Sequence, residues 1–190
     1  DRRYAKTQHQ LIRCTILNDA DVLTHSEEWG GKLRKCYDIL DELYGDFKTM
    51  LDVKATMVLL GTKLGDYDQV IDWIDEERGE IDADFHPRSE ADFLYGCANS
   101  ILNEWGSNES QYVRDLKEYA TVLLNDAKKI QEKFGEHSRL IRSLELEADY
   151  AANDYTKNVI SAKIKLLKAG LEQVEVMIDK GEEDVEFIQH

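Results

Sequence analysis

The sequence has a single proline, Pro87, and eleven glycines among 190 residues. Because these two residue types punctuate sheets and loops, their scarcity leaves few signals for strands and tight turns. Charged residues make up 33% of the chain, and apolar residues recur at intervals of three and four. This combination predicts an all-α fold.

The chain also lacks a long apolar run. No stretch approaches the roughly 20 apolar residues that a membrane-spanning helix needs, so we expect no membrane insertion. The first ten residues, DRRYAKTQHQ, are polar and lack the apolar segment of a secretion signal. They also lack an initiator methionine, so we expect a piece of a longer protein. An intracellular location, cytoplasmic or nuclear, is the expectation.

Cysteine is scarce as well. Cys14, Cys36 and Cys97 are widely spaced and odd in number, and they form no CxxC or Cys/His pattern. A disulfide framework is therefore not indicated. We expect buried free thiols in a reducing compartment.

Basic residues are outnumbered, with 24 Lys and Arg against 39 Asp and Glu and a net charge of −15. Residues 66–92 carry eleven acids against two bases, and residues 172–190 carry seven acids against one base, whereas residues 110–171 have a net charge of +2. Such a field repels nucleic-acid phosphates and attracts a basic partner. A solvated face that only keeps the chain soluble is the alternative.

Signatures of catalysis and of cofactor binding are absent. The chain has no GxSxG, GxxxxGK or GxGxxG motif, and no HxxxH or ExxH pair that would hold a metal on a helix. We therefore expect no enzyme activity, no metal and no cofactor. The five histidines, which are isolated from one another, are His9, His25, His86, His137 and His190.

The stretch from Leu59 to Pro87 predicts a helical hairpin. Gly65 permits a turn and Asp66 can cap the next helix. Apolar residues then recur at helical spacing until Pro87, which cannot continue a helix. Similar patterns predict helices over about 3–19, 26–44, 47–63, 89–105, 111–133, 138–152 and 156–177, the last bent at Gly170.

The predicted helices from residue 48 onward form three pairs that begin near 48, 89 and 138, a period of about 40–50 residues. We therefore expect one helical-repeat domain over residues 1–190. It would comprise an N-terminal helix pair (1–47), three helical hairpins (48–180) and an acidic tail that frays (181–190).

The segment GDYDQVIDWIDEERGEID resembles the turn and second helix of a tetratricopeptide repeat. Met57, Leu60, Gly61 and Leu64 resemble the spaced residues of that family's first helix, and Tyr95-Gly96 stands where the family has Leu-Gly. The resemblance covers about residues 50–170 and implies antiparallel hairpins stacked as an α-solenoid. Another helical hairpin array and a closed bundle are the alternatives.

In such a solenoid the first helices line a concave face that holds peptides. The residues that the resemblance places there, as peptide-binding or partner-binding candidates, are Thr62, Glu90, Phe93, Cys97, Ile101, Glu145 and Asp149. An acidic groove suits a basic or amphipathic segment. The sequence therefore predicts a non-catalytic protein-interaction module or scaffold. A structural subunit of a larger assembly and a small-molecule-sensing regulator or enzyme with a pocket between helices are the alternatives.

Overall fold

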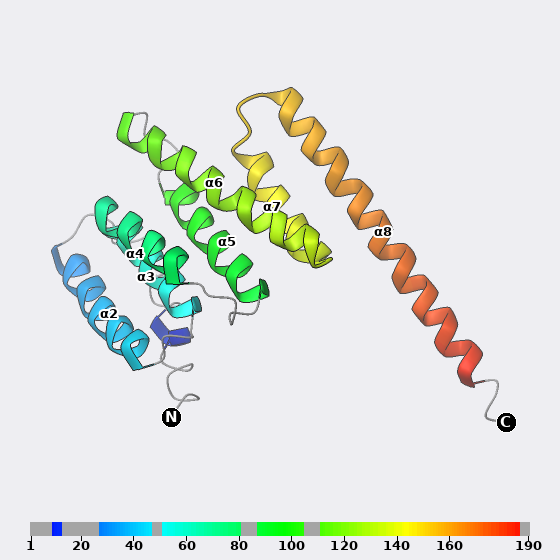
Figure 1. Cartoon of the computed structure of the whole chain (residues 1–190), viewed down its shortest axis with the longest axis horizontal. Helices are drawn as coiled ribbons and strands as arrows, with labels where there is room; N and C mark the ends of the chain where they lie inside the picture. The colour runs from blue at the N-terminus through cyan, green and yellow to red at the C-terminus, as the bar shows by residue number, and fades with distance from the viewer. Residues whose placement is uncertain (1–8, 13–26, 47–50, 81–86, 105–110, 187–190) are drawn as a thin grey trace. The chain divides into compact units, whose positions relative to one another are not determined.

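The computed structural model describes residues 9–12, 27–46, 51–80, 87–104 and 111–186. Apart from short turns, these residues lie in helices, and no strand occurs among them (Figure 1). The predicted all-α class is therefore confirmed for this part of the chain. No helix in it is both long enough and apolar enough to cross a membrane.

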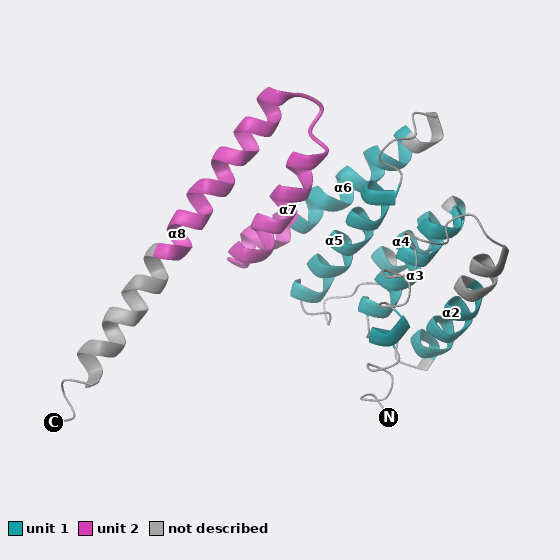
Figure 2. Ribbon diagram, turned by 180° about the vertical axis from the view of Figure 1, so that it is seen from behind, with its two compact units in different colours: residues 1–127 teal, residues 128–190 magenta. Residues whose placement is uncertain are grey.

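The chain divides into two compact units, Asp1–Ala127 and Lys128–His190 (Figure 2). The boundary falls inside α6 (Gln111–Lys133), so one helix contributes to both units. The sequence predicts one domain of three hairpins. That division into repeats stays a prediction.

Unit 1 is organised around α3 (Leu51–Leu64), which packs against α2 (Glu27–Asp46), α4 (Tyr67–Glu80) and α5 (Pro87–Glu104). Buried residues occur all round α3, as expected of a helix enclosed by its neighbours. They are Leu51, Val53, Lys54, Thr56, Met57, Val58, Leu60, Gly61 and Thr62.

The helix predicted over 89–105 is confirmed as α5, and six of its apolar residues are buried: Phe93, Leu94, Cys97, Ala98, Ile101 and Leu102. The helix α5 comes close to α3 at Gly96. A β-carbon on Gly96 would lie 3.4 Å from the β-carbon of Ala55 on α3. The small side chains thus bring α3 and α5 near each other.

The turn between α3 and α4 has the predicted glycine in a left-handed conformation, with φ +73° at Gly65. Gly65 N–H donates to the carbonyl of Thr62, and Asp66 N–H donates to the carbonyl of Gly61. This pair of bonds is the Schellman motif, which satisfies carbonyls at a helix end. The predicted hairpin over α3 and α4 is therefore confirmed.

The start of α5 differs from the prediction. The helix begins at Pro87, where the sequence predicts the end of the preceding hairpin, and not at residue 89. Proline is well suited to the first position of a helix, because its missing N–H would have no partner there. The predicted N-terminal helix is described only at residues 9–12, which are helical. Its remainder lies outside the described residues.

Unit 2 contains the end of α6, then α7 (His137–Asp149) and α8 (Asp154–Glu186). Gly135, with φ +69°, ends α6 through a second Schellman motif, in which Glu136 N–H donates to the carbonyl of Gln131. The two helices α7 and α8 share one apolar cluster. Its buried members are Leu140, Ile141, Leu144, Ala148, Ile160 and Ile164.

The start of α8 is capped by a side chain. Asn153 precedes the helix and does not adopt a left-handed conformation. Its side-chain Oδ1 instead accepts a hydrogen bond from Thr156 N–H at 2.9 Å, so Asn153 itself caps the helix. The helix α8 continues to Glu186, and the fraying predicted after Gly181 stays a prediction.

Candidate functional site

Four of the predicted partner-binding residues lie in the core of unit 1. Thr62, Phe93, Cys97 and Ile101 are each at most 2% exposed. Thr62 also donates its hydroxyl hydrogen to the carbonyl of Leu59 at 2.7 Å. In this structure these side chains serve packing, and their role in binding a partner stays a prediction.

The other three predicted residues reach the surface to different extents. Glu90 on α5 is half-buried, whereas Glu145 and Asp149 on α7 are exposed. Glu145 accepts a hydrogen bond from Lys168 on α8 at 2.8 Å. Glu90 belongs to unit 1 and the α7 pair to unit 2, so neither unit by itself assembles the predicted set.

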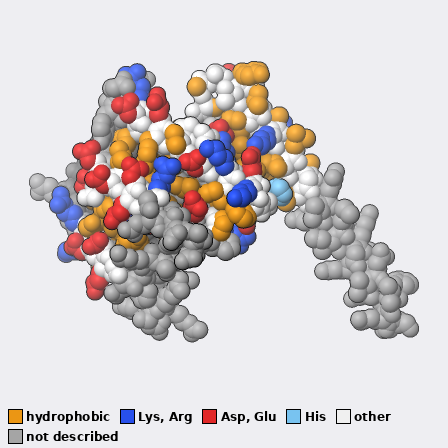
Figure 3. Space-filling view, in the orientation of Figure 1, with side chains coloured by type: hydrophobic (Ala, Val, Ile, Leu, Met, Phe, Trp, Pro, Cys, Tyr) orange, Lys and Arg blue, Asp and Glu red, His pale blue; other side chains and the backbone are white. Residues whose placement is uncertain are grey.

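The most distinctive feature of unit 1 is a stacked aromatic pair whose tyrosine is influenced by the charges of three exposed carboxylates. Tyr37 on α2 and Trp73 on α4 have ring centroids 5.3 Å apart and planes inclined by 16°. Trp73 is buried and Tyr37 is half-buried, while Asp38, Asp41 and Asp66 are exposed. We call these five residues the acidic aromatic patch. Figure 3 shows many acidic side chains over the face of unit 1 in view.

The three carboxylates of the patch act on the phenol of Tyr37. Burial raises the pKa of Tyr37, and the negative charges of Asp41, Asp38 and Asp66 raise it further because they oppose a phenolate. The same charges would favour a cation placed beside the ring. Sequence reasoning missed this patch because its acids come from α2 and from the turn before α4, which only the fold brings together.

A second group of charges in unit 1 is buried and internally paired. Lys54 on α3 is 3% exposed, and its Nζ lies 3.2 Å from Glu76 Oε2 and 3.9 Å from Glu77 Oε1. Tyr44 donates a hydrogen bond to Glu77, and Lys54 lies over the Tyr44 ring, 4.5 Å from its centroid. Because these groups pair with one another, they join α2, α3 and α4 and serve to stabilise the fold.

His9 is the one histidine of the described residues that is buried, at 0% exposure. Its Nε2 lies 2.7 Å from Thr56 Oγ1, and its Nδ1 lies 3.5 Å from Asp52 Oδ2. Thr56 donates its own hydrogen to the carbonyl of Asp52, so Oγ1 accepts from Nε2–H. This contact attaches residues 9–12 to α3.

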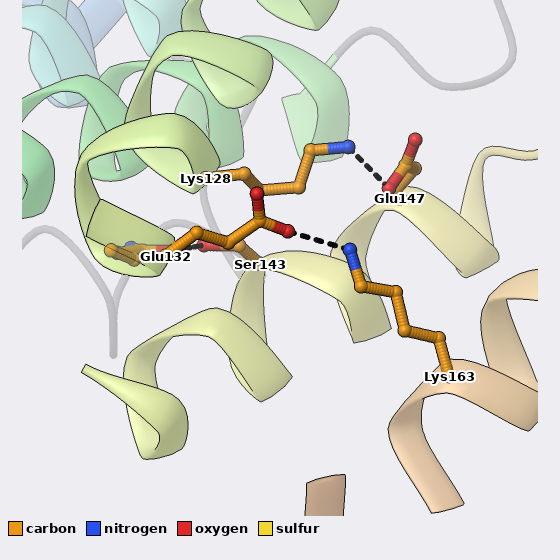
Figure 4. Close-up of polar contacts among 6 residues, drawn as sticks. Lys128, Glu132, Ser143, Glu147 and Lys163 are labelled. Atoms are coloured by element: carbon orange, nitrogen blue, oxygen red, sulfur yellow. Dashed lines mark hydrogen bonds and ion pairs between the residues drawn. The ribbon is translucent and has the colours of Figure 1, made fainter. Parts of the chain in front are cut away.

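Polar contacts hold the three helical segments of unit 2 together (Figure 4). Lys128 and Glu147 pair at 2.5 Å, and Glu132 and Lys163 pair at 2.6 Å. In addition, the buried Ser143 donates a hydrogen bond to the buried Gln131 at 2.9 Å. The end of α6 is thereby tied to both α7 and α8.

The helix α8 carries two apolar faces. Ile160, Ile164, Leu167 and Leu171 face α7. A second set at spacings of four and three is exposed and consists of Tyr155, Val159, Ala162, Leu166 and Ala169. We call this second set the outer stripe. In Figure 3, hydrophobic side chains line the described part of α8.

Among the described residues, no group of three or more His, Cys, Asp or Glu side chains is arranged to hold a metal ion. Cys36 and Cys97 are free thiols, but only Cys97 is buried as predicted, because Cys36 is half-buried; Cys14 lies outside the described residues. Burial raises the pKa of the Cys97 thiol, and the charge of Glu77 raises it further, so the reactive thiolate is disfavoured.

No protein-family model matches the chain, and neither a curated protein nor a solved structure is significantly similar to it.

Proposed function

We propose that this protein is a non-catalytic interaction module that binds a basic segment of another polypeptide at the acidic aromatic patch. The observation that carries the proposal is the stacking of the half-buried Tyr37 on Trp73, together with the negative charges of Asp41, Asp38 and Asp66, which raise the pKa of Tyr37. The tetratricopeptide-like stacking of hairpins stays a prediction, and the proposal does not require it.

The chemistry of the patch suits lysine or arginine. An aromatic ring attracts a cation through its quadrupole, and nearby carboxylates add ion pairs. Because the Tyr37–Trp73 pair is already stacked, little side-chain entropy is lost when a partner binds. Arg34 and Lys35, one turn before Asp38 on α2, are exposed and would repel a basic segment. The surface that the partner covers would therefore not extend to Arg34 and Lys35.

Fluorescence anisotropy with labelled peptides tests the proposal. The probe is a peptide of about 15 residues that alternates Lys or Arg with Leu, and the comparison peptide has Glu at every basic position. We expect the basic peptide to bind at the patch and the acidic peptide not to bind there. The affinity for the basic peptide should fall as salt is raised, because the contacts are exposed and screened. Asp38→Asn with Asp41→Asn should weaken binding roughly tenfold, which corresponds to about 1.4 kcal/mol.

The matched control removes the same charge elsewhere in unit 1. Asp115→Asn with Glu118→Gln neutralises two exposed carboxylates on α6. If both double variants weaken binding equally, the effect comes from net charge and the patch is not the site. Basic-peptide binding that neither double variant weakens would also contradict the proposal.

A further inference from the structure

The outer stripe of α8 has the geometry of a helix-docking surface. At about 100° per residue, its members lie on the side of α8 nearly opposite to the residues that face α7. Its three large members are strongly exposed, with Tyr155 at 79%, Val159 at 53% and Leu166 at 77%. Single exposed apolar residues are ordinary, but a contiguous row of them marks an interaction surface.

The spacing and the sizes of the stripe residues favour a helical partner. Steps of four, three, four and three from Tyr155 to Ala169 follow the seam of a coiled coil. The small residues Ala162 and Ala169 alternate with Val159 and Leu166, which leaves holes for the partner's side chains. The described stripe is about 21 Å long at 1.5 Å per residue, so a partner helix of about four turns would cover it.

The charges beside the stripe select the partner. By helical angle, Lys163 and Lys165 border it on opposite sides near its middle, while the acids Asp154 and Glu172 lie at the ends of the described part. Lys165 is exposed, and Lys163 is half exposed while paired with Glu132. Residues flanking a helix seam set partner choice through opposite charge.

A second copy of the chain fits these charges poorly. If two stripes paired antiparallel around Ala162 and Leu166, Lys163 and Lys165 of both copies would fall in one short stretch. Like charges at such flanking positions disfavour pairing. A helix with acidic flanks would instead meet both lysines with opposite charge.

We infer that the outer stripe of α8 docks an amphipathic helix of another polypeptide whose apolar seam is flanked by Glu or Asp. This surface belongs to unit 2 and is independent of the acidic aromatic patch proposed above, which belongs to unit 1. One surface can therefore fail its test while the other passes.

Peptide binding measured by anisotropy tests the inference on the full chain. The probe is a labelled peptide of about 18 residues with Leu at the seam positions and Glu at the flanking positions, and a second peptide has Lys in place of Glu. We expect the acidic peptide to bind and the basic peptide to bind at least tenfold more weakly at this site. Leu166→Asp should weaken acidic-peptide binding at least tenfold, since a charge would then lie in the seam.

Two further variants make the test specific. Lys165→Glu should weaken binding of the acidic peptide and strengthen binding of the basic one. Val122→Asp is the matched control, because Val122 is an exposed apolar residue on α6, outside the stripe, at 49% exposure. It should leave acidic-peptide binding unchanged. Because Leu166 is exposed, its substitution should preserve the fold, which thermal unfolding checks, and Leu166→Ala repeats the test without a new charge.

Three outcomes would overturn the inference. The first is equal binding of the acidic and basic peptides to a chain that carries Asp38→Asn with Asp41→Asn, in which the acidic aromatic patch is neutralised. The second is binding of the acidic peptide that Leu166→Asp and Lys165→Glu leave intact. The third is concentration-dependent self-association in sedimentation that Leu166→Asp abolishes, because the occupant of the stripe would then be a second copy.

Discussion

Gly61 on α3 and Val70 on α4 are packed so closely that a β-carbon added to Gly61 would lie 2.6 Å from Val70 Cγ2. The same β-carbon would lie 3.0 Å from the Trp73 ring. Glycine inside a helix is normally unfavourable by about 1 kcal/mol relative to alanine. Here the missing side chain allows the two helices of the hairpin to approach each other.

Gly61→Ala should therefore destabilise the protein, by about 1–3 kcal/mol, as overpacking in a core does. Valine is stiff about its first side-chain torsion, so Val70 cannot move aside cheaply. Urea unfolding measures the change. Val70→Ala in the same chain should reduce the cost of the glycine substitution, because it removes the nearest methyl group.

Gly170 provides the control for this substitution. It lies inside α8, and a β-carbon there would meet nothing within 4 Å. Gly170→Ala should stabilise α8 by up to about 1 kcal/mol through helix propensity alone. If both alanine substitutions shift stability in the same direction, close packing at Gly61 is not what determines its effect.

The hairpin around Gly65 could be predicted from the sequence because its signals are local: a glycine for the turn and apolar residues at helical spacing on either side. The core of α5 could be predicted for the same reason. The central position of α3 could not, since its burial all round depends on neighbours supplied by α2 and α5. Its polar Lys54 and Thr56 give no local sign of being buried.

The site was harder to predict than the fold. A resemblance to a repeat family assigns Phe93, Cys97 and Ile101 to a binding face from their register alone, and the same periodicity equally describes a core-facing stripe. The outer stripe of α8 is present in the sequence as a second row of apolar residues. The sequence does not show which of the two rows packs against α7, the outer stripe or the row that begins at Ile160.

Lys54 should be hard to replace because Glu77 is buried beside it at 2% exposure. Lys54→Met removes the Lys54 cation from beside that carboxylate and should cost about 3 kcal/mol or more. Glu76→Gln should cost at most about 1 kcal/mol, because the Glu76 side chain is 59% exposed and screened by solvent.

A double-mutant cycle in urea measures the coupling between the two buried groups. Lys54→Met together with Glu77→Gln should be less destabilising than the sum of the single changes, since neither buried charge then remains. Strictly additive costs would mean that Lys54 and Glu77 do not stabilise each other.

In unit 2, the buried hydrogen bond should matter more than the exposed ion pair. Ser143→Ala leaves Gln131 Oε1 without its donor in a buried position and should cost about 1–3 kcal/mol. Lys163→Ala removes a pair whose side chains are 50% and 47% exposed and should cost at most about 1 kcal/mol. Thermal unfolding of both variants compares the two losses of stability. Raising the salt concentration should reduce only the loss caused by Lys163→Ala. The reverse ranking would show that unit 2 depends mainly on its surface charges.

The protein should lose stability as the solution becomes strongly alkaline, and Tyr119 should account for part of the loss. Burial raises the pKa of Tyr119 above its ordinary value of 10.0, and its hydrogen bond to Asp75, 2.5 Å long, raises it further, against an opposing effect of Arg78. The unfolded chain therefore releases this proton first, so stability present below about pH 10 falls as the pH rises further.

Tyr119→Phe removes the titrating group and the hydrogen bond together. We expect the variant to be less stable than the wild type at pH 7 and to have a shallower decline above pH 10. The free energy of unfolding in urea, measured between pH 7 and 11, checks both parts. Parallel curves for the two proteins would show that Tyr119 does not contribute to the pH dependence.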